Sequence, residues 1–365
     1  MKTYKKLSDI SELVGGYAFK SDNYVSNGIR VVRIANVQDG YFSDEHPCFY
    51  SVSITRGLGK AMLQENDLLM SLTGNVGRVA FLPKSMLPAG LNQRVECIRV
   101  GDENLKKYLY YYFRSISFVN EAVRNSTGVA QLNLSTKWLG EHLIPVVSPN
   151  ESASIVKNLE AIDLAIKKCE QEFTYYDELT KSRFIEMFGK DDGDIPLDQL
   201  CEICRGASPR PISNFITTNP HGINWIKIGD VEPNAIYITK TEEKITKEGA
   251  AKSREVHPGD FILSNSMSFG RPYILGIDGC VHDGWLIISN YQKHYRPLFL
   301  YFLLRSESVQ NQFSKNAGGT TVKNLNSDLV KTTKVNLYPL DKQDEFVNLV
   351  EQIDKLKFSN RNPNT

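Results

Sequence analysis

The longest regular pattern of apolar residues lies in the middle of the chain, where residues 152–188 contain neither glycine nor proline. Apolar side chains recur there at alternating spacings of four and three, at Ile155, Leu159, Ile162, Ile166, Cys169, Phe173 and Tyr176. This heptad spacing predicts a long helix that packs along another helix. At about 1.5 Å per residue the helix would be roughly 55 Å long. Gly189 is placed to end it.

A second helix of this kind is expected from Lys342 to about Phe358. The polar residues 359–365 are not expected to continue it far, so it would be about half as long as the first. A full-length antiparallel pair within the chain is therefore not expected, and part of the first helix needs another partner. The residues expected to face a partner helix are Ile155, Leu159, Ile162, Ile166, Phe173, Phe346, Val350 and Ile353.

The rest of the chain contains an internal repeat, at an offset that drifts only between 190 and 194 residues. Matches keep their order along the whole length, which chance does not produce. Corresponding segments include Gly16 with Gly206, 31–37 with 225–231, 66–71 with 259–264, Gly77-Arg78 with Gly270-Arg271, Phe113-Arg114-Ser115 with Leu304-Arg305-Ser306, and Asn133-Leu134 with Asn324-Leu325.

Each copy has the same internal plan. Strand-like runs separated by Gly, Asn, Asp and Pro come first, and an aromatic helix follows, as in residues 108–113. A glycine-containing loop and a strand close the copy. We expect the aromatic side chains to belong to the core rather than to a base-stacking platform.

These patterns predict a mixed α/β fold with two β-rich repeated domains joined by long coiled-coil-like helices, elongated and pseudo-twofold in symmetry. The expected divisions are a first domain at 1–147, a central helix at 148–189, a second domain at 190–340, and a short helix with a polar tail at 341–365.

Composition narrows the class of protein. Hydrophobic residues make up 41% of the chain and charged residues 23%, as in a soluble globular protein. The longest apolar run, Leu298 to Leu304, is too short to cross a bilayer, and the N-terminus does not resemble a secretory signal. The six cysteines do not form the dense pattern of a disulfide framework, which favours reduced thiols in the cytoplasm. We interpret Cys201 and Cys204 as structural thiols rather than as a metal site, since no second CxxC accompanies them.

The net charge is only +1, which at first argues against a nucleic-acid-binding protein. The distribution is more informative, because positive charge is in excess in residues 1–147 and negative charge in residues 148–189. This pattern is compatible with DNA binding by the globular segments but is not itself evidence for it.

Catalytic signatures are missing from the sequence. It contains no P-loop, no Asn-Pro-Pro-aromatic tetrapeptide, and no GxGxxG, GxSxG or HExxH motif. The dipeptide His282-Asp283 is interpreted as a DNA contact or a plain turn rather than as an acid–base pair. No catalytic residue, metal site or cofactor is predicted.

Polar residues gather instead in loops at equivalent places in the two copies. Arg, Asn, Gln, Ser and Thr side chains can read base edges, and neighbouring glycines let the backbone approach a phosphate. The alternative is that these loops are ordinary β-turns. The residues predicted to contact DNA are Thr73, Asn75, Arg78, Asn92, Gln93 and Arg94 in the first copy, and Asn265, Ser266, Ser268, Arg271, His282, Asp283 and Lys323 in the second.

The ending of the second copy resembles a known family. Asn324-Leu325, the strand at 333–337 and the lead Pro339-Leu340-Asp341-Lys342-Gln343 are similar to the specificity subunit of type I restriction–modification enzymes. In the first copy Ile144-Pro145 fits this pattern, but Ser152 stands where Gln is usual. The resemblance covers nearly the whole chain and depends on the order of these motifs, twice over.

The resemblance implies two target recognition domains, each reading one half of a bipartite double-stranded DNA site. The long helices would set the distance between the half-sites and dock two methyltransferase subunits, which restriction subunits would join. Such a subunit does no chemistry itself, needs no cofactor and does not enter a membrane. The short C-terminal helix departs from the family pattern.

Two other functions are kept as alternatives. A DNA-binding adaptor or regulator would never meet a methyltransferase, and co-purification with two methyltransferase chains separates it from the first hypothesis. A stand-alone nuclease would cleave DNA as a purified chain with a divalent metal ion.

Overall fold

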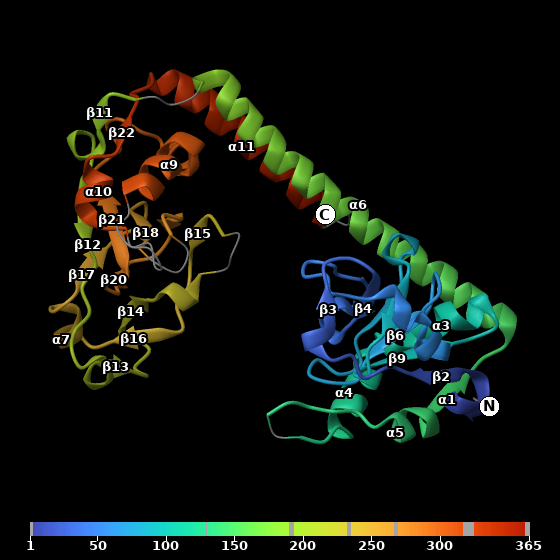
Figure 1. Cartoon of the computed structure of the whole chain (residues 1–365). Helices are drawn as coiled ribbons and strands as arrows, with labels where there is room; N and C mark the ends of the chain where they lie inside the picture. The colour runs from blue at the N-terminus through green and yellow to red at the C-terminus, as the bar shows by residue number, and fades with distance from the viewer. Residues whose placement is uncertain are drawn as a thin grey trace. The chain divides into compact units, whose positions relative to one another are not determined.

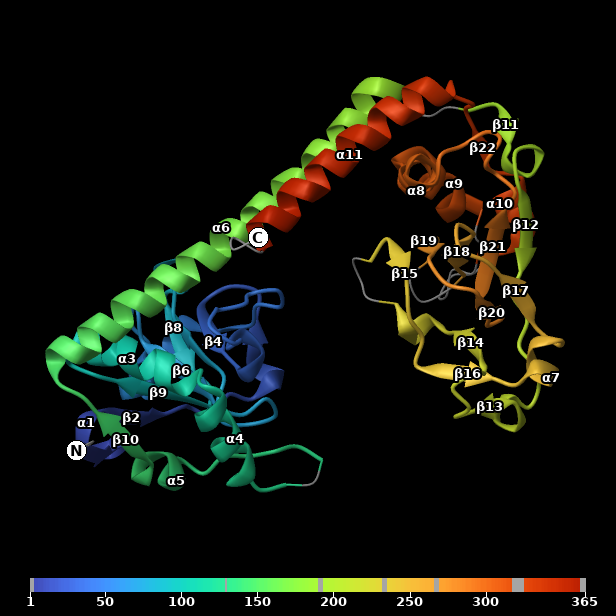
Figure 2. The same cartoon turned by 180° about the vertical axis from the view of Figure 1, so that it is seen from behind.

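The computed structural model describes residues 3–128, 130–189, 193–231, 235–265, 269–316 and 325–361. The chain divides into two compact units, Met1–Lys168 and Cys169–Thr365 (Figures 1 and 2). The division falls within one continuous helix, α6 (Pro149–Phe188).

The first unit begins with strands and ends with helices. Its elements are β1 (Thr3–Lys6), α1 (Leu7–Ile10), β2 (Glu12–Gly15), β3 (Tyr24–Val25), β4 (Ile29–Val32), β5 (Phe49–Tyr50), α2 (Thr55–Leu58), β6 (Leu68–Ser71), β7 (Val79–Phe81), β8 (Ala89–Leu91), β9 (Val95–Arg99), α3 (Glu103–Phe113), α4 (Ile116–Arg124), α5 (Thr136–Glu141) and β10 (Leu143–Val146).

Two small sheets form the centre of this unit, in the strand orders β2-β9-β6-β7 and β3-β5-β4-β8. Strand β6 is buried on both faces, which explains its uninterrupted apolar run. Leu68 and Met70 pack with residues of α3 and α4, whereas Leu69 packs in a second core with residues of the other sheet. Alternate side chains of one strand therefore contribute to two cores.

The aromatic helix of the first unit belongs to the core, as predicted. Asp102 caps α3 by accepting a hydrogen bond from the backbone N–H of Leu105 at 2.7 Å. Tyr108, Tyr110 and Phe113 are buried against the sheet. These rings are consequently unavailable as a base-stacking platform.

The second unit repeats the order of elements. They are β11 (Ile195–Pro196), β12 (Glu202–Arg205), β13 (Ile216–Thr217), β14 (Ile223–Ile226), β15 (Tyr237–Ile238), β16 (Glu243–Ile245), α7 (Lys247–Ala250), β17 (Arg254–Val256), β18 (Phe261–Ser264), β19 (Pro272–Leu275), β20 (Gly279–Val281), β21 (Trp285–Ser289), α8 (Pro297–Arg305), α9 (Glu307–Asn316), α10 (Ser327–Lys331), β22 (Lys334–Val335) and α11 (Leu340–Arg361).

The sheets confirm the internal duplication. The second unit has the orders β12-β21-β18-β19-β15 and β13-β16-β14-β20-β17, which extend the two sheets of the first unit by one edge strand each. In both units one strand pair is parallel, β4 with β8 and β14 with β20. Even a side-chain pair is repeated, since Arg114 lies 5.1 Å from the centre of the Tyr110 ring and Arg305 lies 5.3 Å from that of Tyr301.

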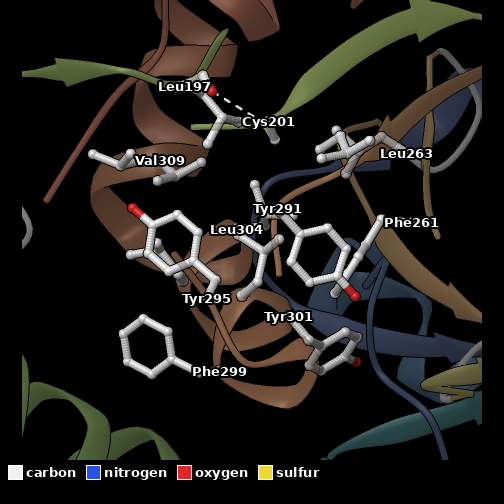
Figure 3. Close-up of a cluster of buried hydrophobic side chains, with 14 of the residues drawn as sticks. Leu197, Cys201, Phe261, Leu263, Tyr291, Tyr295, Phe299, Tyr301, Leu304 and Val309 are labelled. Carbon is white, nitrogen blue, oxygen red and sulfur yellow. Dashed lines mark hydrogen bonds between the residues drawn. The ribbon is translucent and has the colours of Figure 1, made fainter. Parts of the chain in front are cut away.

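The main core of the second unit is rich in aromatic side chains (Figure 3). Tyr291, Tyr295 and Phe299 are almost completely buried in it. Phe184 of α6 and Phe346 of α11 join it from the two long helices. The C-terminal half of α6 and helix α11 are thereby fixed to this unit.

The long helices bear out most of the sequence prediction. Helix α6 has 40 residues and α11 has 22, close to the expected ratio. Helix α6 ends where Gly189 takes a left-handed φ of +72° and its N–H donates to the carbonyl of Ile185 at 2.7 Å. Figures 1 and 2 show α11 beside the C-terminal half of α6, and Lys357 pairs with Asp177 at 2.8 Å.

The expected bounds of the second helix were wrong at both ends. Helix α11 begins at Leu340 rather than Lys342, directly after Pro339, and runs to Arg361 rather than to about Phe358. The polar residues after Phe358 stay helical because no glycine or proline interrupts the backbone before Pro363. Within the part of the chain that the structure describes, no helix combines the length and apolar character needed to span a membrane.

Candidate nucleic-acid interface

The carboxyl ends of the parallel strand pairs bring polar residues together at the same place in both units. Arg33 follows β4 and Asn92 follows β8, and the N–H of Asn92 donates to the carbonyl of Val32 at 3.0 Å. In the second unit Lys227 and His282 stand in the same positions after β14 and β20. Each unit therefore carries a basic side chain and a polar turn at the carboxyl ends of its parallel strand pair.

The turn at this edge has the same capping arrangement in both units. The side-chain oxygen of Asn92 accepts from the N–H of Arg94 at 3.2 Å, and Nδ1 of His282 accepts from the N–H of Gly284 at 2.8 Å. Because Nδ1 accepts, the neutral His282 ring carries its proton on Nε2, which lies 3.3 Å from Oδ1 of Asp283. Both side chains thus stabilise a turn, whatever else they contact.

A matched glycine lets a second segment approach each turn closely. A Cβ on Gly16 would lie 2.2 Å from the carbonyl oxygen of Asn92, and one on Gly206 would lie 2.3 Å from that of His282. No side chain fits at either position. The match of these two glycines in the internal repeat therefore has a physical reason.

The structure brings the loop containing Thr73 to the turn at Asn92–Arg94. The N–H of Leu72 donates to the carbonyl of Arg94 at 3.0 Å, and Oγ1 of Thr73 donates to the side-chain oxygen of Asn133 at 2.9 Å. Gln93 and Arg94 are exposed beside it. Thr73, Asn92, Gln93 and Arg94 form one polar group, to which the structure adds Asn133.

Arg78 and Asn75 lie in a different group. Nη1 of Arg78 donates to the side-chain oxygen of Gln38 at 2.6 Å. The amide of Asn75 lies 3.2 Å from both terminal nitrogens of Arg78 when its oxygen faces them. Gln38 also lines a polar pocket of about 300 Å³ with Tyr41 and His46. Sequence reasoning did not find Gln38, which lies 40 residues from its partner.

In the second unit the loop after β18 has the same backbone role as its counterpart. The N–H of Asn265 donates to the carbonyl of Gly284 at 3.2 Å, and its own carbonyl accepts from Leu325 at 2.8 Å. Asn265 is only 6% exposed, and its contact with DNA stays a prediction. The N–H of Arg271 donates to Oγ of Ser264, as that of Arg78 does to Ser71. Ser266, Ser268 and Lys323 lie outside the described residues.

Asp283 is held by a segment that the sequence analysis did not select. Ser208 donates to its Oδ1 at 2.7 Å, Arg210 to its Oδ2 at 3.0 Å, and Nε of Arg205 to its backbone carbonyl at 2.9 Å. The hydrogen bond from Ser208, together with the hydrogen bond and the positive charge of Arg210, holds the pKa of Asp283 below its usual range. The signal in the sequence was two arginines flanking a Gly-Ala-Ser-Pro segment whose first residue is the matched Gly206.

The predicted partner-helix residues divide into two sets. Ile155 and Leu159 are half-buried on α6, and Phe173 is half-buried nearer its end. Phe346, Val350 and Ile353 of α11 are buried within the second unit. Ile162 and Ile166, by contrast, are 54% and 52% exposed. Within the described residues, the apolar stripe of α6 is therefore covered only in part.

The cysteine pair fits a structural role. Cys201 is buried in the main core of the second unit, and its Sγ donates to the carbonyl of Leu197 at 3.1 Å (Figure 3). Burial raises the pKa of its thiol to about 12, which disfavours the thiolate needed to bind metal. Among the described residues there is no group of three or more His, Cys, Asp or Glu side chains that could hold a metal ion.

Comparison with known proteins shows which family shares this duplicated frame. The model of the type I restriction modification DNA specificity domain matches residues 1–172 and again 191–365. The chain belongs to this family. It carries the specificity domain twice, in agreement with the repeated sheets.

Relatives with assigned names agree with this membership. The chain is 23% identical over 382 residues to the type I restriction enzyme EcoBI specificity subunit of Escherichia coli, covering 95% of this chain and 78% of that protein. It is 29% identical over 163 residues to the EcoAI specificity subunit of Escherichia coli, covering 43% of this chain and 27% of that protein.

Solved structures show the same fold at low identity. The type I restriction–modification S subunit from M. genitalium superposes with a TM-score of 0.50 at 13% identity, covering 99% of this chain and 91% of that one. A chain from a structure of complex assembly and conformational transition in the type I R-M system gives a TM-score of 0.56 at 14% identity, covering 99% and 93%.

Proposed function

We propose that this specificity subunit binds a bipartite double-stranded DNA site, with one half-site read by each recognition domain. The observation that carries the proposal is the repeated turn after β8 and β20. Its backbone frame is the same in both units, but Asn92, Gln93 and Arg94 in one are replaced by His282, Asp283 and Gly284 in the other. A constant frame with different polar side chains is suited to reading two different short sequences.

The partners we propose are two methyltransferase subunits and, through them, restriction subunits. Support comes from Ile162 and Ile166, which continue the heptad stripe of α6 but are more than half exposed. An apolar stripe of this kind favours a partner helix. The elongated pseudo-twofold arrangement, the domain limits at 1–147 and 190–340, the cytoplasmic location and the absence of catalysis by this chain remain parts of the same proposal.

The test of this function is a genome-wide map of adenine methylation in the source organism, with and without the gene. Deletion is expected to abolish one split motif, consisting of two short defined halves around an undefined spacer. Restoring the gene should restore the motif. An unchanged map would contradict the proposal, and cleavage by the purified chain or failure to co-purify with a methyltransferase would favour the nuclease or the adaptor alternative.

Arg78 and Arg271 offer a direct test of the two half-sites. Replacement of either by alanine is expected to weaken binding or relax its own half-site by about 1–3 kcal/mol, the cost of losing a bidentate contact to guanine. The measurement is the methylated motif and the affinity for DNA that carries it. Arg124, exposed on α4, provides a matched control whose replacement should change neither. An unchanged motif in both variants would remove these arginines from the interface.

A further inference from the structure

Asp283 joins two segments of the second domain that are far apart in the sequence. Its carboxylate accepts from Ser208 and Arg210, and its backbone carbonyl accepts from Arg205. Its own N–H donates to Oγ of Ser208 at 3.1 Å. Four hydrogen bonds therefore connect the turn after β20 to the last residue of β12 and to the segment that follows it.

These contacts leave positive charge, rather than the carboxylate, available to a ligand. Both carboxylate oxygens of Asp283 are occupied by donors of its own chain, and its side chain is 28% exposed. The side chain of Arg210 is 79% exposed, and Arg205 is exposed as well. Each guanidinium uses one N–H donor in this network, out of the five that it carries.

We infer that Arg205 and Arg210 form a DNA phosphate-binding pair on the second domain, with Asp283 as the residue that positions them. The inference rests on the proposed function and names residues for it. The guanidinium group of arginine can donate two parallel N–H bonds to the oxygens of one phosphate. A guanidinium that is already held in place loses less side-chain entropy when it binds. In phosphate binding Asp283 then acts through the arginines, because its own negative charge would repel phosphate.

The pair is particular to the second domain. The strand pairing places Gly15 in the first domain where Arg205 stands in the second, because both lie opposite equivalent positions of the next strand, Glu96 and Leu286. The turn residue matched to Asp283 is Gln93. The first domain lacks this arginine and this carboxylate, so loss of the pair should affect phosphate contacts of one domain only.

The salt dependence of binding tests the pair. The full chain is titrated with a mixed-sequence DNA duplex at several salt concentrations, as the wild type and as Arg205→Ala, Arg210→Ala and the double variant. Each lost phosphate contact should lower the slope of log K against log salt by about 0.9, whatever the DNA sequence. Lys240→Ala is the matched control, since Lys240 is exposed and follows β15, at the opposite edge of the sheet from β12.

Asp283→Ala separates positioning from direct contact by the sign of its effect. Loss of a negative charge near phosphate would by itself tighten binding, whereas loss of the anchor should weaken it and lower the slope. Asp283→Asn, which keeps one acceptor oxygen, should recover part of the affinity. Tryptophan fluorescence, to which the buried Trp225 and Trp285 of this domain contribute, reports whether the domain is folded in each variant.

The possible failures are distinguishable. A wild-type chain without salt-dependent binding contradicts the proposed function itself. Wild-type binding with an unchanged slope in the double variant, or with an equal loss in Lys240→Ala, overturns the phosphate-binding pair. Tighter binding by a folded Asp283→Ala overturns the positioning role.

Discussion

Replacement of Phe346 by alanine is expected to destabilise the second unit by about 3–5 kcal/mol, the usual cost of emptying a large buried aromatic site. Phe346 is fully buried. Its ring centre lies 5.3 Å from those of Phe184 and Phe302, 5.8 Å from that of Phe188 and 6.3 Å from that of Phe299. The substitution would open a cavity at the point where α11, α6 and α8 meet.

Hydrogen exchange of the full chain measures this effect, because the first unit serves as an internal reference. Protection in α8 and α11 should fall about a hundredfold or more, while that of the first unit stays constant. The control is Leu356→Ala on the same helix, because Leu356 is 53% exposed and its truncation should cost little. Equal effects of the two substitutions would show that α11 does not depend on the aromatic cluster.

The sequence predicted the elements that depend on regular spacing. The heptad spacing predicted the long helix α6 and its packing along a second helix, α11. Gly189 ends α6 as expected. The order of repeated motifs gave the duplicated sheets. These features are local, or repeat in register, so one chain carries enough information to find them.

Contacts between distant segments could not be found in this way. Asp283 is hydrogen-bonded to Ser208, 75 residues away in the sequence, and to Arg210, 73 residues away. These contacts depend on strand pairings that no sequence motif predicts. Gln38 holds Arg78 for a similar reason. Sequence reasoning located the polar turns but not their partners, because register between strands is decided by packing over the whole sheet.

The departure of the first copy from the family pattern at Ser152 has a structural explanation. In the second unit the fully buried amide of Gln343 donates to the carbonyls of His294 and Tyr338 and accepts from the N–H of Arg296, all at 2.8 Å. In the first unit Ser152 is also buried and accepts from the side chain of Asn104 at 2.7 Å. Different residues thus tie the start of each long helix to its domain.

A buried carboxyl makes the stability of the first unit depend on pH. Glu96 lies on β9 and is 3% exposed, and its Oε2 has no hydrogen-bond partner within the described part of the chain. Burial raises its pKa from 4.5 to about 7. The register of the strands places Leu286 at the equivalent position of the second unit, where it is fully buried.

The sign of the pH dependence follows from the raised pKa. Below the ordinary value of 4.5 the carboxyl is neutral in the folded and unfolded chain and costs nothing. Between 4.5 and about 7 the unfolded chain gives up this proton while the folded unit keeps it, so stability falls as pH rises. Above about 7 the full penalty of an ionised buried group applies, about 3 kcal/mol at 1.36 kcal/mol per pH unit.

Glu96→Leu, which installs the residue of the second unit, is therefore expected to stabilise the first unit, and by more at about pH 8 than at about pH 5. Hydrogen exchange of β6 and β9 at a series of pH values, corrected for intrinsic exchange, measures the difference. Glu141→Leu on α5 is the control, since Glu141 is exposed and its replacement should leave the pH dependence as it is in the wild type. A gain from Glu96→Leu that is constant across this range would mean that the carboxyl ionises as easily in the folded unit as in the unfolded chain, and the gain in stability would then reflect packing alone.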